Sequence, residues 1–148
     1  MLLPLMVNFM KTGILLESIL PKSRIKSRLI DIVAYASDAG FYHLRPKAVV
    51  QPVSEKEIVA LFAFSHLHKI PLTFRTAGTS LSGQAISDGI LVDLSQFWDT
   101  IHAEEEGNIV RVQPGAIGGI VNTYLRKYSR KIGPDPSSIN SAMMGGIL

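Results

Sequence analysis

The sequence predicts an α+β domain built on a mixed sheet. Three short apolar runs have the length and composition of strands: residues 48–50, 72–74 and 90–94. A helical pattern over residues 54–69 separates the first two runs, so these strands should run parallel in a right-handed βαβ unit. A hairpin pattern after the third run adds antiparallel pairing, which makes the sheet mixed.

The helix expected over residues 54–69 has a clear signal at its start. Ser54 and Glu57 have the spacing of a capping box, in which each side chain bonds a backbone N–H near the other residue. The apolar face of this helix is expected to include Ile58, Leu61, Phe62 and Leu67.

The hairpin is expected to join residues 101–103 to residues 108–112. Pro114 and Gly115 end its second strand, and a helix should follow over residues 117–128.

Residues 1–44 are expected to form an N-terminal helical extension ahead of a domain spanning residues 45–148. A short apolar helix is predicted at residues 14–20, where Pro21 ends it. An amphipathic helix is predicted over residues 23–36, with Ile25, Leu29, Ile32 and Val33 on its apolar side.

The size and composition fit one folded domain and exclude several classes of function. The chain has 148 residues, of which 47% are hydrophobic and 18% charged, and this is enough for a single core. The net charge of +3 is mild. The basic clusters near residues 22–28 and 126–131 carry no nucleic-acid-binding motif, so we expect solvated helix faces and no nucleic-acid partner.

Sites that depend on cysteine or on clustered histidine are not expected. The chain has no cysteine, which excludes disulfides, a thiol nucleophile and cysteine-bound metals within it. His66 and His68 are two apart on a predicted helix, so they should point in different directions, and no metal site is expected.

No targeting or membrane-spanning signal stands out in the sequence. No apolar run is long enough to span a bilayer. The apolar start at residues 1–7 lacks a preceding basic segment and a clear cleavage site. A cytoplasmic location is therefore expected, with peripheral membrane contact as the alternative.

The segment directly after residues 72–74 is rich in small residues. Residues 75–84 read RTAGTSLSGQ, and such a loop can bring several backbone N–H groups close to one anion because no bulky side chain blocks the approach. It lacks the lysine of a Walker loop and the glycine spacing of a Rossmann turn. The residues alone leave an ordinary Gly/Ser-rich connection open as the alternative.

A second small-residue segment, GPDPSS, spans residues 133–138 and is followed by Gly145 and Gly146. Its two prolines stiffen the backbone. Two such segments suggest a nucleotide cofactor that is held at two points. From the residues alone, however, the favoured role of Asp135 and Ser138 is to cap the following turn.

Together these segments resemble the flavin-binding signatures of the FAD-linked oxidases of the vanillyl-alcohol-oxidase and p-cresol-methylhydroxylase type. The lead-in YASDAGFY with RPKAVV completes the resemblance, which covers roughly residues 30–148. Within that superfamily the chain is similar to the bacterial D-lactate dehydrogenase and glycolate oxidase group. The resemblance implies a p-cresol-methylhydroxylase-type FAD-binding domain. We expect it to be truncated at its C-terminus, because in the family the Gly-Gly pair leads into the rest of the FAD domain and a substrate-covering domain.

The resemblance also implies which residues hold FAD. Arg75 could neutralise phosphate charge or be a surface charge at the strand end, and Pro114–Gly115 could equally be a simple turn. No histidine lies between His68 and His102, where some relatives attach FAD covalently, so non-covalent FAD is expected. The residues expected to bind FAD are Arg75, Thr76, Ala77, Gly78, Thr79, Ser80, Gly83, Gln84, Pro114, Gly115, Pro134, Asp135, Pro136, Ser137, Ser138, Gly145 and Gly146.

The resemblance further implies an FAD-linked oxidoreductase in which the flavin N5 accepts a hydride from the α-carbon of a D-2-hydroxy acid. In the family, the residues that deprotonate and grip the substrate belong to the C-terminal part. No catalytic residue is therefore expected here, and the chain alone should turn over little or no substrate. Two alternatives remain: a stand-alone nucleotide-binding module without turnover, and an interaction protein whose exposed sheet edge pairs with a partner.

Overall fold

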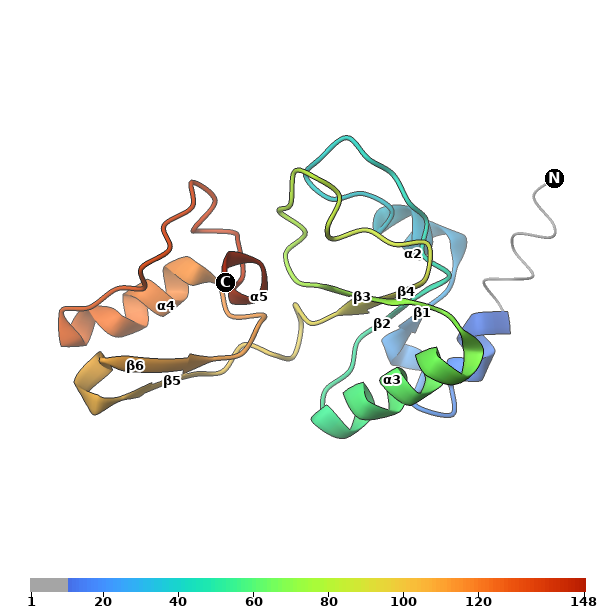
Figure 1. Ribbon diagram of the computed structural model, residues 1–148, viewed down its shortest axis with the longest axis horizontal. Helices are drawn as coiled ribbons and strands as arrows, with labels where there is room; N and C mark the ends of the chain where they lie inside the picture. The colour runs from blue at the N-terminus through green and yellow to red at the C-terminus, as the bar shows by residue number, and fades with distance from the viewer. Residues whose placement is uncertain (1–10) are drawn as a thin grey trace.

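The computed structural model describes residues 11–148, which form two lobes side by side (Figure 1). The N-terminal lobe contains a four-stranded sheet in the order β1-β2-β4-β3. Strands β2, β4 and β3 are parallel, and β1 runs antiparallel to β2, so the predicted α+β class with a mixed sheet is confirmed. The strands are β1 (Ile25–Lys26), β2 (Ala48–Val50), β3 (Leu72–Arg75) and β4 (Ile90–Asp93).

The predicted βαβ unit is present, with one strand inserted into it. Helix α3 (Glu55–His68) connects β2 to β3, and β4 lies between these two strands in the sheet. All residues of β2 and β4 are buried, because helices cover both faces. Helix α3 and residues 11–20 pack on one face. Helix α2 (Leu29–Ala34) packs on the other, where Ile32 contacts Val49 and Leu91.

The start of α3 matches its prediction, but its buried face differs. The Ser54 side chain accepts a hydrogen bond from the Glu57 N–H at 3.4 Å, and Lys69 ends the helix in a left-handed conformation. Leu61 is buried as expected, whereas Phe62 and Leu67 are 54% and 75% exposed. Phe64, three residues after Leu61, takes their place against the sheet.

The prediction for residues 23–36 is wrong in its first half. A short 3-10 turn, η1 (Lys22–Arg24), leads into β1, and the helix is limited to α2. Ile25 is buried because it pairs with Val50 and extends the sheet, a long-range contact that helical spacing cannot reveal.

The other expected N-terminal helix is displaced: residues 11–16 are helical, and residues 17–20 form turns. Because this segment and β1 contribute to the same core as β2 and β4, the boundary between residues 44 and 45 stays a prediction. The expectations for residues 1–7 lie outside the described residues.

The C-terminal lobe pairs a hairpin with helices. Val121 and Leu125 pack against the apolar side chains of the hairpin, which include Ile101 and Val110. The predicted hairpin and helix are confirmed, although the last helical turn is of the 3-10 type. No helix within residues 11–148 has both the length and the apolar character needed to cross a membrane. The elements are β5 (Ile101–Glu104), η2 (Glu105–Gly107), β6 (Ile109–Val112), α4 (Gly118–Leu125), η3 (Arg126–Tyr128) and α5 (Met144–Ile147).

Candidate functional site

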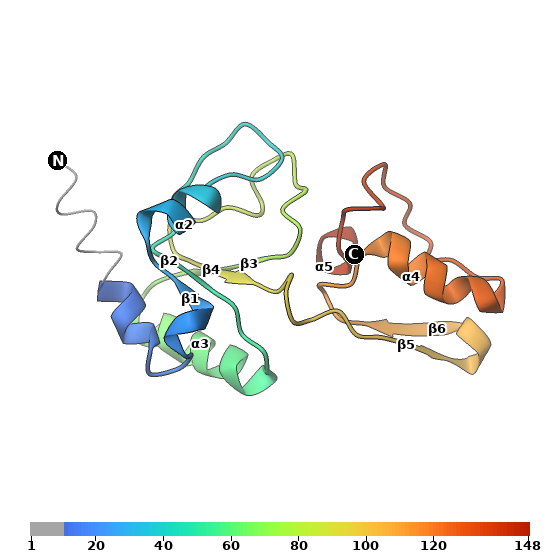
Figure 2. The ribbon, with the colours of Figure 1, turned by 180° about the vertical axis from the view of Figure 1, so that it is seen from behind.

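A cavity of about 890 Å³ lies where the two lobes face each other. The loop after β3 forms one wall, and Pro114 together with residues 134–147 forms the other. In both views of the ribbon, the loop after β3 and helix α5 lie on opposite sides of this junction (Figures 1 and 2). The predicted residues that line the cavity are Arg75, Thr76, Gly78, Thr79, Ser80, Gln84, Pro114, Pro134, Asp135, Pro136, Ser138, Gly145 and Gly146.

Four predicted residues do not line the cavity: Ala77, Gly83, Gly115 and Ser137. Gly115 instead packs against the end of β4, where a Cβ atom would lie 2.5 Å from the Leu94 carbonyl oxygen. Seven further residues line the cavity, and all except Ser82 are apolar residues that the sequence could not distinguish from core. The missed residues are Phe74, Leu81, Ser82, Ala85, Leu94, Ala142 and Ile147.

The loop after β3 is shaped by its own side chains. The Ser80 hydroxyl donates to the Gln84 side-chain oxygen and accepts the N–H groups of Ser82 at 3.2 Å and Gln84 at 3.3 Å. Gly78 has a φ of +68°, a conformation that favours glycine. The Ser80 and Gln84 side chains therefore hold the loop in shape.

This loop contains backbone N–H groups that no acceptor in the described part of the chain occupies. Among residues 11–148, no protein acceptor receives the N–H groups of four successive residues that line it: Gly78, Thr79, Ser80 and Leu81. Consecutive backbone N–H groups without partners are a recurrent arrangement for binding an anion.

Arg75 lies behind this loop, and its guanidinium is not a solvated surface charge. Its Nη1 atom donates to the carbonyl oxygens of Ser37 at 2.7 Å, Ala85 at 3.2 Å and Tyr35 at 3.4 Å. Its Cζ atom lies 5.5 Å from the centre of the Tyr35 ring. The guanidinium thus connects three segments of backbone at the end of β3.

A buried polar network supports the same end of the sheet. The Asp93 carboxylate is 1% exposed and accepts hydrogen bonds from the Tyr35 hydroxyl at 2.8 Å and the Gln51 amide at 2.9 Å. Its second oxygen accepts from the N–H and hydroxyl of Ser95. Burial, together with the hydrogen bond to Asp93, raises the pKa of Tyr35 to about 12. Tyr35 therefore stays protonated at neutral pH and remains a donor.

The second wall depends on a close approach at Gly145. The Gly145 N–H donates to the Pro114 carbonyl at 2.9 Å, and a Cβ atom there would lie 2.7 Å from the Pro114 Cβ and 3.1 Å from the Thr76 Cγ2. Gly145 thus stands between the two walls. Asp135 is exposed and forms an ion pair with Lys131 at 3.3 Å.

The turn after residue 138 is closed by carbonyl groups. The Ser138 carbonyl accepts the N–H groups of Ser141 at 2.8 Å and Ala142 at 2.7 Å. Among the described residues, the Asp135 side chain bonds only Lys131 and the Ser138 hydroxyl bonds no group of this turn, so neither side chain caps it in the expected alternative role.

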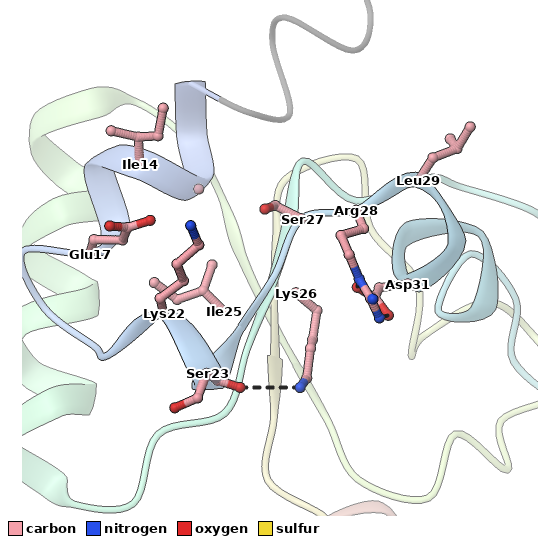
Figure 3. Close-up of a pocket in the computed structure, with 11 residues that line it drawn as sticks. Ile14, Glu17, Lys22, Ser23, Ile25, Lys26, Ser27, Arg28, Leu29 and Asp31 are labelled. Atoms are coloured by element: carbon pink, nitrogen blue, oxygen red, sulfur yellow. Dashed lines mark hydrogen bonds and ion pairs between the residues drawn. The ribbon is translucent and has the colours of Figure 1, made fainter.

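A further cavity of about 640 Å³ lies between residues 13–17 and 22–31, away from every predicted site residue (Figure 3). Two of its three basic side chains have partners on its own rim: Arg28 binds Asp31 at 2.8 Å, and Lys26 donates to the Ser23 carbonyl at 3.1 Å. Because its charges are mixed and partly paired, we regard the cavity between the lobes as the better site for an anionic cofactor.

Comparisons with known proteins identify the family of the chain. A family described as an FAD binding domain matches residues 46–148. The glycolate oxidase subunit GlcD of Escherichia coli K12 is 31% identical over 119 residues, which cover 78% of this chain and 24% of GlcD. D-2-hydroxyglutarate dehydrogenase of the same organism is 34% identical over 122 residues, which cover 80% of this chain and 12% of that protein. The chain thus spans a quarter or less of the length of these relatives.

Solved structures show the same fold at low sequence identity. An alkyldihydroxyacetonephosphate synthase superimposes with a TM-score of 0.75 and 16% identity, covering 93% of this chain and 28% of that one. A p-cresol methylhydroxylase superimposes with a TM-score of 0.65 and 17% identity, covering 82% of this chain and 25% of that one. The predicted p-cresol-methylhydroxylase-type fold is therefore confirmed.

Proposed function

The chain belongs to the family of FAD-binding domains, and from this premise we propose that the cavity between its lobes binds FAD non-covalently in an oxidoreductase that acts on a 2-hydroxy acid. The observation that carries the proposal is the row of four unpartnered N–H groups at residues 78–81 on the cavity wall. Bound FAD would supply the two-electron oxidising chemistry. The part of this chain is to bind and orient the cofactor.

The N–H groups of residues 78–81 suit the pyrophosphate of FAD. Hydrogen bonds to a charged phosphate oxygen are stronger than those between neutral groups, and the small side chains of this loop leave the approach open. The volume of about 890 Å³ falls in the range that is common for cofactor and ligand sites.

The other polar and apolar groups of the cavity suit different parts of the cofactor. The exposed Asp135 carboxylate would repel a phosphate but can accept hydrogen bonds from sugar or ribityl hydroxyls. Leu81, Leu94 and Ile147 give the cavity apolar surface against which a flat ring can pack.

The proposal of non-covalent binding rests on the chemistry of the lining residues. The wall formed by the described residues contains no histidine, cysteine or tyrosine, which are the side chains with a ring nitrogen, thiol or phenol able to attack the cofactor. Denaturation should therefore release the flavin completely.

The substrate class follows from the names of three relatives. Glycolate oxidase, D-2-hydroxyglutarate dehydrogenase and the D-lactate dehydrogenase of Anaerostipes hadrus are named for acids with a hydroxyl at carbon 2. Among the cavity-lining residues that the structure describes, Arg75 and Asp135 are the only titratable ones, and neither is placed as a general base. We therefore assign substrate deprotonation to none of the described residues that line this cavity.

The test is a comparison of FAD with riboflavin, which lacks the pyrophosphate. The purified chain is equilibrated with each flavin, and the retained visible absorbance is measured after gel filtration and after denaturation. We expect saturable FAD binding, release of the flavin on denaturation, and much weaker binding of riboflavin. Equal binding of both flavins, or no saturable FAD binding, would contradict the proposal.

A partner-binding role is the second candidate, and one observation favours it. Strand β3 forms an edge of the sheet, and beside it the rings of Phe62 and Phe74 lie 5.7 Å apart with both residues at least 40% exposed. Such an edge can pair with another chain. Concentration-dependent association that Phe62→Ser abolishes, measured by sedimentation without flavin, would support this role. A monomer at all concentrations would exclude self-association.

A further inference from the structure

Arg75 holds a position that neither of its expected roles describes. One nitrogen of its guanidinium, Nη1, donates to the carbonyl oxygens of Tyr35, Ser37 and Ala85. Two of these carbonyls lie about forty residues earlier in the chain, on the segment that precedes β2, and the third lies at the end of the cavity loop. Nη1 shares its two N–H groups among three acceptors and has none left for a phosphate, so a phosphate contact by Arg75 would have to come from Nε or Nη2.

The rest of the guanidinium packs against the loop backbone. A Cβ atom at Gly78 would lie 2.4 Å from the Arg75 Nη2 atom and 2.8 Å from its Nε atom, so the loop runs directly over the guanidinium. Glycine is required there both for this contact and for its φ of +68°. The guanidinium therefore lies directly against Gly78, the residue that carries the first of the four free N–H groups.

The segment before β2 supports the loop from the same side. The Ala39 N–H donates to the Gly78 carbonyl at 3.0 Å, and a Cβ atom at Gly40 would lie 2.6 Å from the Leu81 carbonyl oxygen. Residues 39 and 40 thus pack against the same stretch, residues 78–81, that lines the cavity and has unpartnered N–H groups. Arg75 binds this supporting segment through Ser37 and Tyr35.

The anchor of this arrangement is a buried carboxylate. The Tyr35 ring lies beside the Arg75 guanidinium, and its hydroxyl donates to Asp93 at 2.8 Å. Asp93 is the partner of Arg75 in the register of β3 and β4. A chain of contacts therefore runs from the sheet through Tyr35 and Arg75 to the loop.

We propose that Arg75 is a positioning residue that preforms the anion-binding loop, and that it is not a phosphate ligand. The identification of the anion with the FAD pyrophosphate rests on the proposed function. The claim that Arg75 preforms the loop does not rest on it. The planar fork of arginine, with several N–H groups in fixed directions, suits this task, and a lysine cannot reproduce it.

The first test needs no cofactor, so a negative result can be distinguished from a failure of the chain to bind FAD. Amide hydrogen exchange is measured in the flavin-free chain for Arg75→Gln, with Arg130→Gln, an exposed arginine in the other lobe, as the matched control. We expect Arg75→Gln to speed exchange at Ala39, Ser82 and Gln84 by about tenfold or more, with the β4 amides unchanged. Unchanged protection at these three amides would overturn the proposal.

A second variant tests the same contact if Arg75→Gln fails to fold. Gly78→Ala places a methyl group against the guanidinium and should speed hydrogen exchange at the same three amides. Normal protection of these amides in a folded Gly78→Ala chain would likewise overturn the proposal.

The second test separates positioning from charge in flavin binding. Arg75→Lys keeps the positive charge but loses the fork. We expect Arg75→Lys to bind FAD about tenfold more weakly, as Arg75→Gln does, and the dependence of the dissociation constant on salt to stay as in the parent chain. Full rescue by Arg75→Lys, or a salt dependence that flattens in Arg75→Gln alone, would identify a direct phosphate contact and overturn the proposal.

Discussion

The two walls of the cavity differ in how firmly the protein holds them. The loop after β3 extends from a four-stranded sheet whose central strands are fully buried, and it is held from behind by Arg75 and residues 35–40. The opposite wall rests on a two-stranded hairpin and short helices. A two-stranded hairpin is marginally stable alone and depends on what packs against it.

The segment that carries the second wall has fewer contacts of its own. Gly133 has no atom within 4 Å of the position of a Cβ, and the nearby ion pair between Lys131 and Asp135 is solvent-exposed. Exposed pairs of this kind stabilise a fold very little. The wall is fixed only after this segment, where residues 139–145 bond to residues 114–119. The Gly119 N–H donates to the Ile139 carbonyl at 2.8 Å, the Met144 N–H to the Ala116 carbonyl at 2.8 Å and the Gly145 N–H to the Pro114 carbonyl at 2.9 Å.

This difference suggests that the two walls contribute differently to cofactor binding. The firm wall presents donors for the strongly charged part of the cofactor, where fixed geometry contributes most to binding. The second wall supplies apolar surface and a carboxylate, and it can adjust to the cofactor. Three predictions test this comparison, beginning with the largest expected effect.

The lobes should respond separately to loss of core packing. Leu61→Ala creates a cavity in the N-terminal core and should lower the free energy of unfolding of that lobe by about 2–5 kcal/mol. Trp98 fluorescence should report the unfolding of this lobe, since the Trp98 ring packs against the same core and its indole N–H donates to the Pro52 carbonyl at 2.7 Å. Denaturant unfolding followed by Trp98 fluorescence measures the effect. Leu125→Ala in the other core is the matched variant, and an equal shift of the Trp98 transition in both would show that the lobes unfold as one unit.

Crowding the contact between the walls should weaken flavin binding more than it weakens the fold. Gly145→Ala places a methyl group 2.7 Å from the Pro114 Cβ in its own wall and 3.1 Å from the Thr76 Cγ2 in the opposite wall. We therefore expect FAD affinity to fall by about 10-fold to 100-fold, measured by equilibrium titration. Gly133→Ala is the control, because a methyl group there meets open space. If both variants bind FAD equally well, the approach at Gly145 does not determine the site.

The ion pair of Arg24 and Glu57, which ties η1 to α3, should make the stability of the N-terminal lobe depend on pH in the acid range. The hydrogen bond from Arg24, at 2.6 Å, holds the pKa of Glu57 below its usual value. The folded state therefore binds this proton more weakly than the unfolded state does. The stabilisation is complete above about pH 4.3 and is lost as pH falls through the lowered folded pKa.

Glu57→Gln tests this dependence. We expect a loss of about 1–2 kcal/mol at neutral pH, and a weaker dependence on pH below 4 in thermal unfolding. Glu104→Gln removes an exposed pair with Arg111 in the other lobe and should change little. A stability profile of Glu57→Gln that parallels the parent chain from neutral to acid pH would count against this account.

Local signals in the sequence predicted much of the fold. The Ser54–Glu57 spacing located the start of α3, and the apolar runs located β2, β3 and β4. These signals can be read from the sequence because a helix cap and a buried strand are each formed by residues that are close together in the chain. Strand β1 was missed because it has two residues and exists through its pairing with Val50. The insertion of β4 between β2 and β3 likewise depends on tertiary pairing.

The cavity was predictable where it consists of small residues and was not where it depends on long-range contacts. The segments at residues 75–84 and 133–138 stood out by composition and meet in one cavity. Leu94 and Ile147 could not be distinguished from core residues. The placement of Arg75 could not be inferred either, since the carbonyls that it binds at residues 35 and 37 lie far from it in the sequence.

The most direct test of the central claim is a titration of the ¹⁵N-labelled chain with FAD, followed by amide chemical shifts. We predict that the largest shifts occur at Gly78, Thr79, Ser80 and Leu81, whose N–H groups have no acceptor among the described residues, with smaller shifts at Gly145. Shifts centred instead on the cavity near Lys22 and Lys26, with the loop after β3 unaffected, would contradict the assignment.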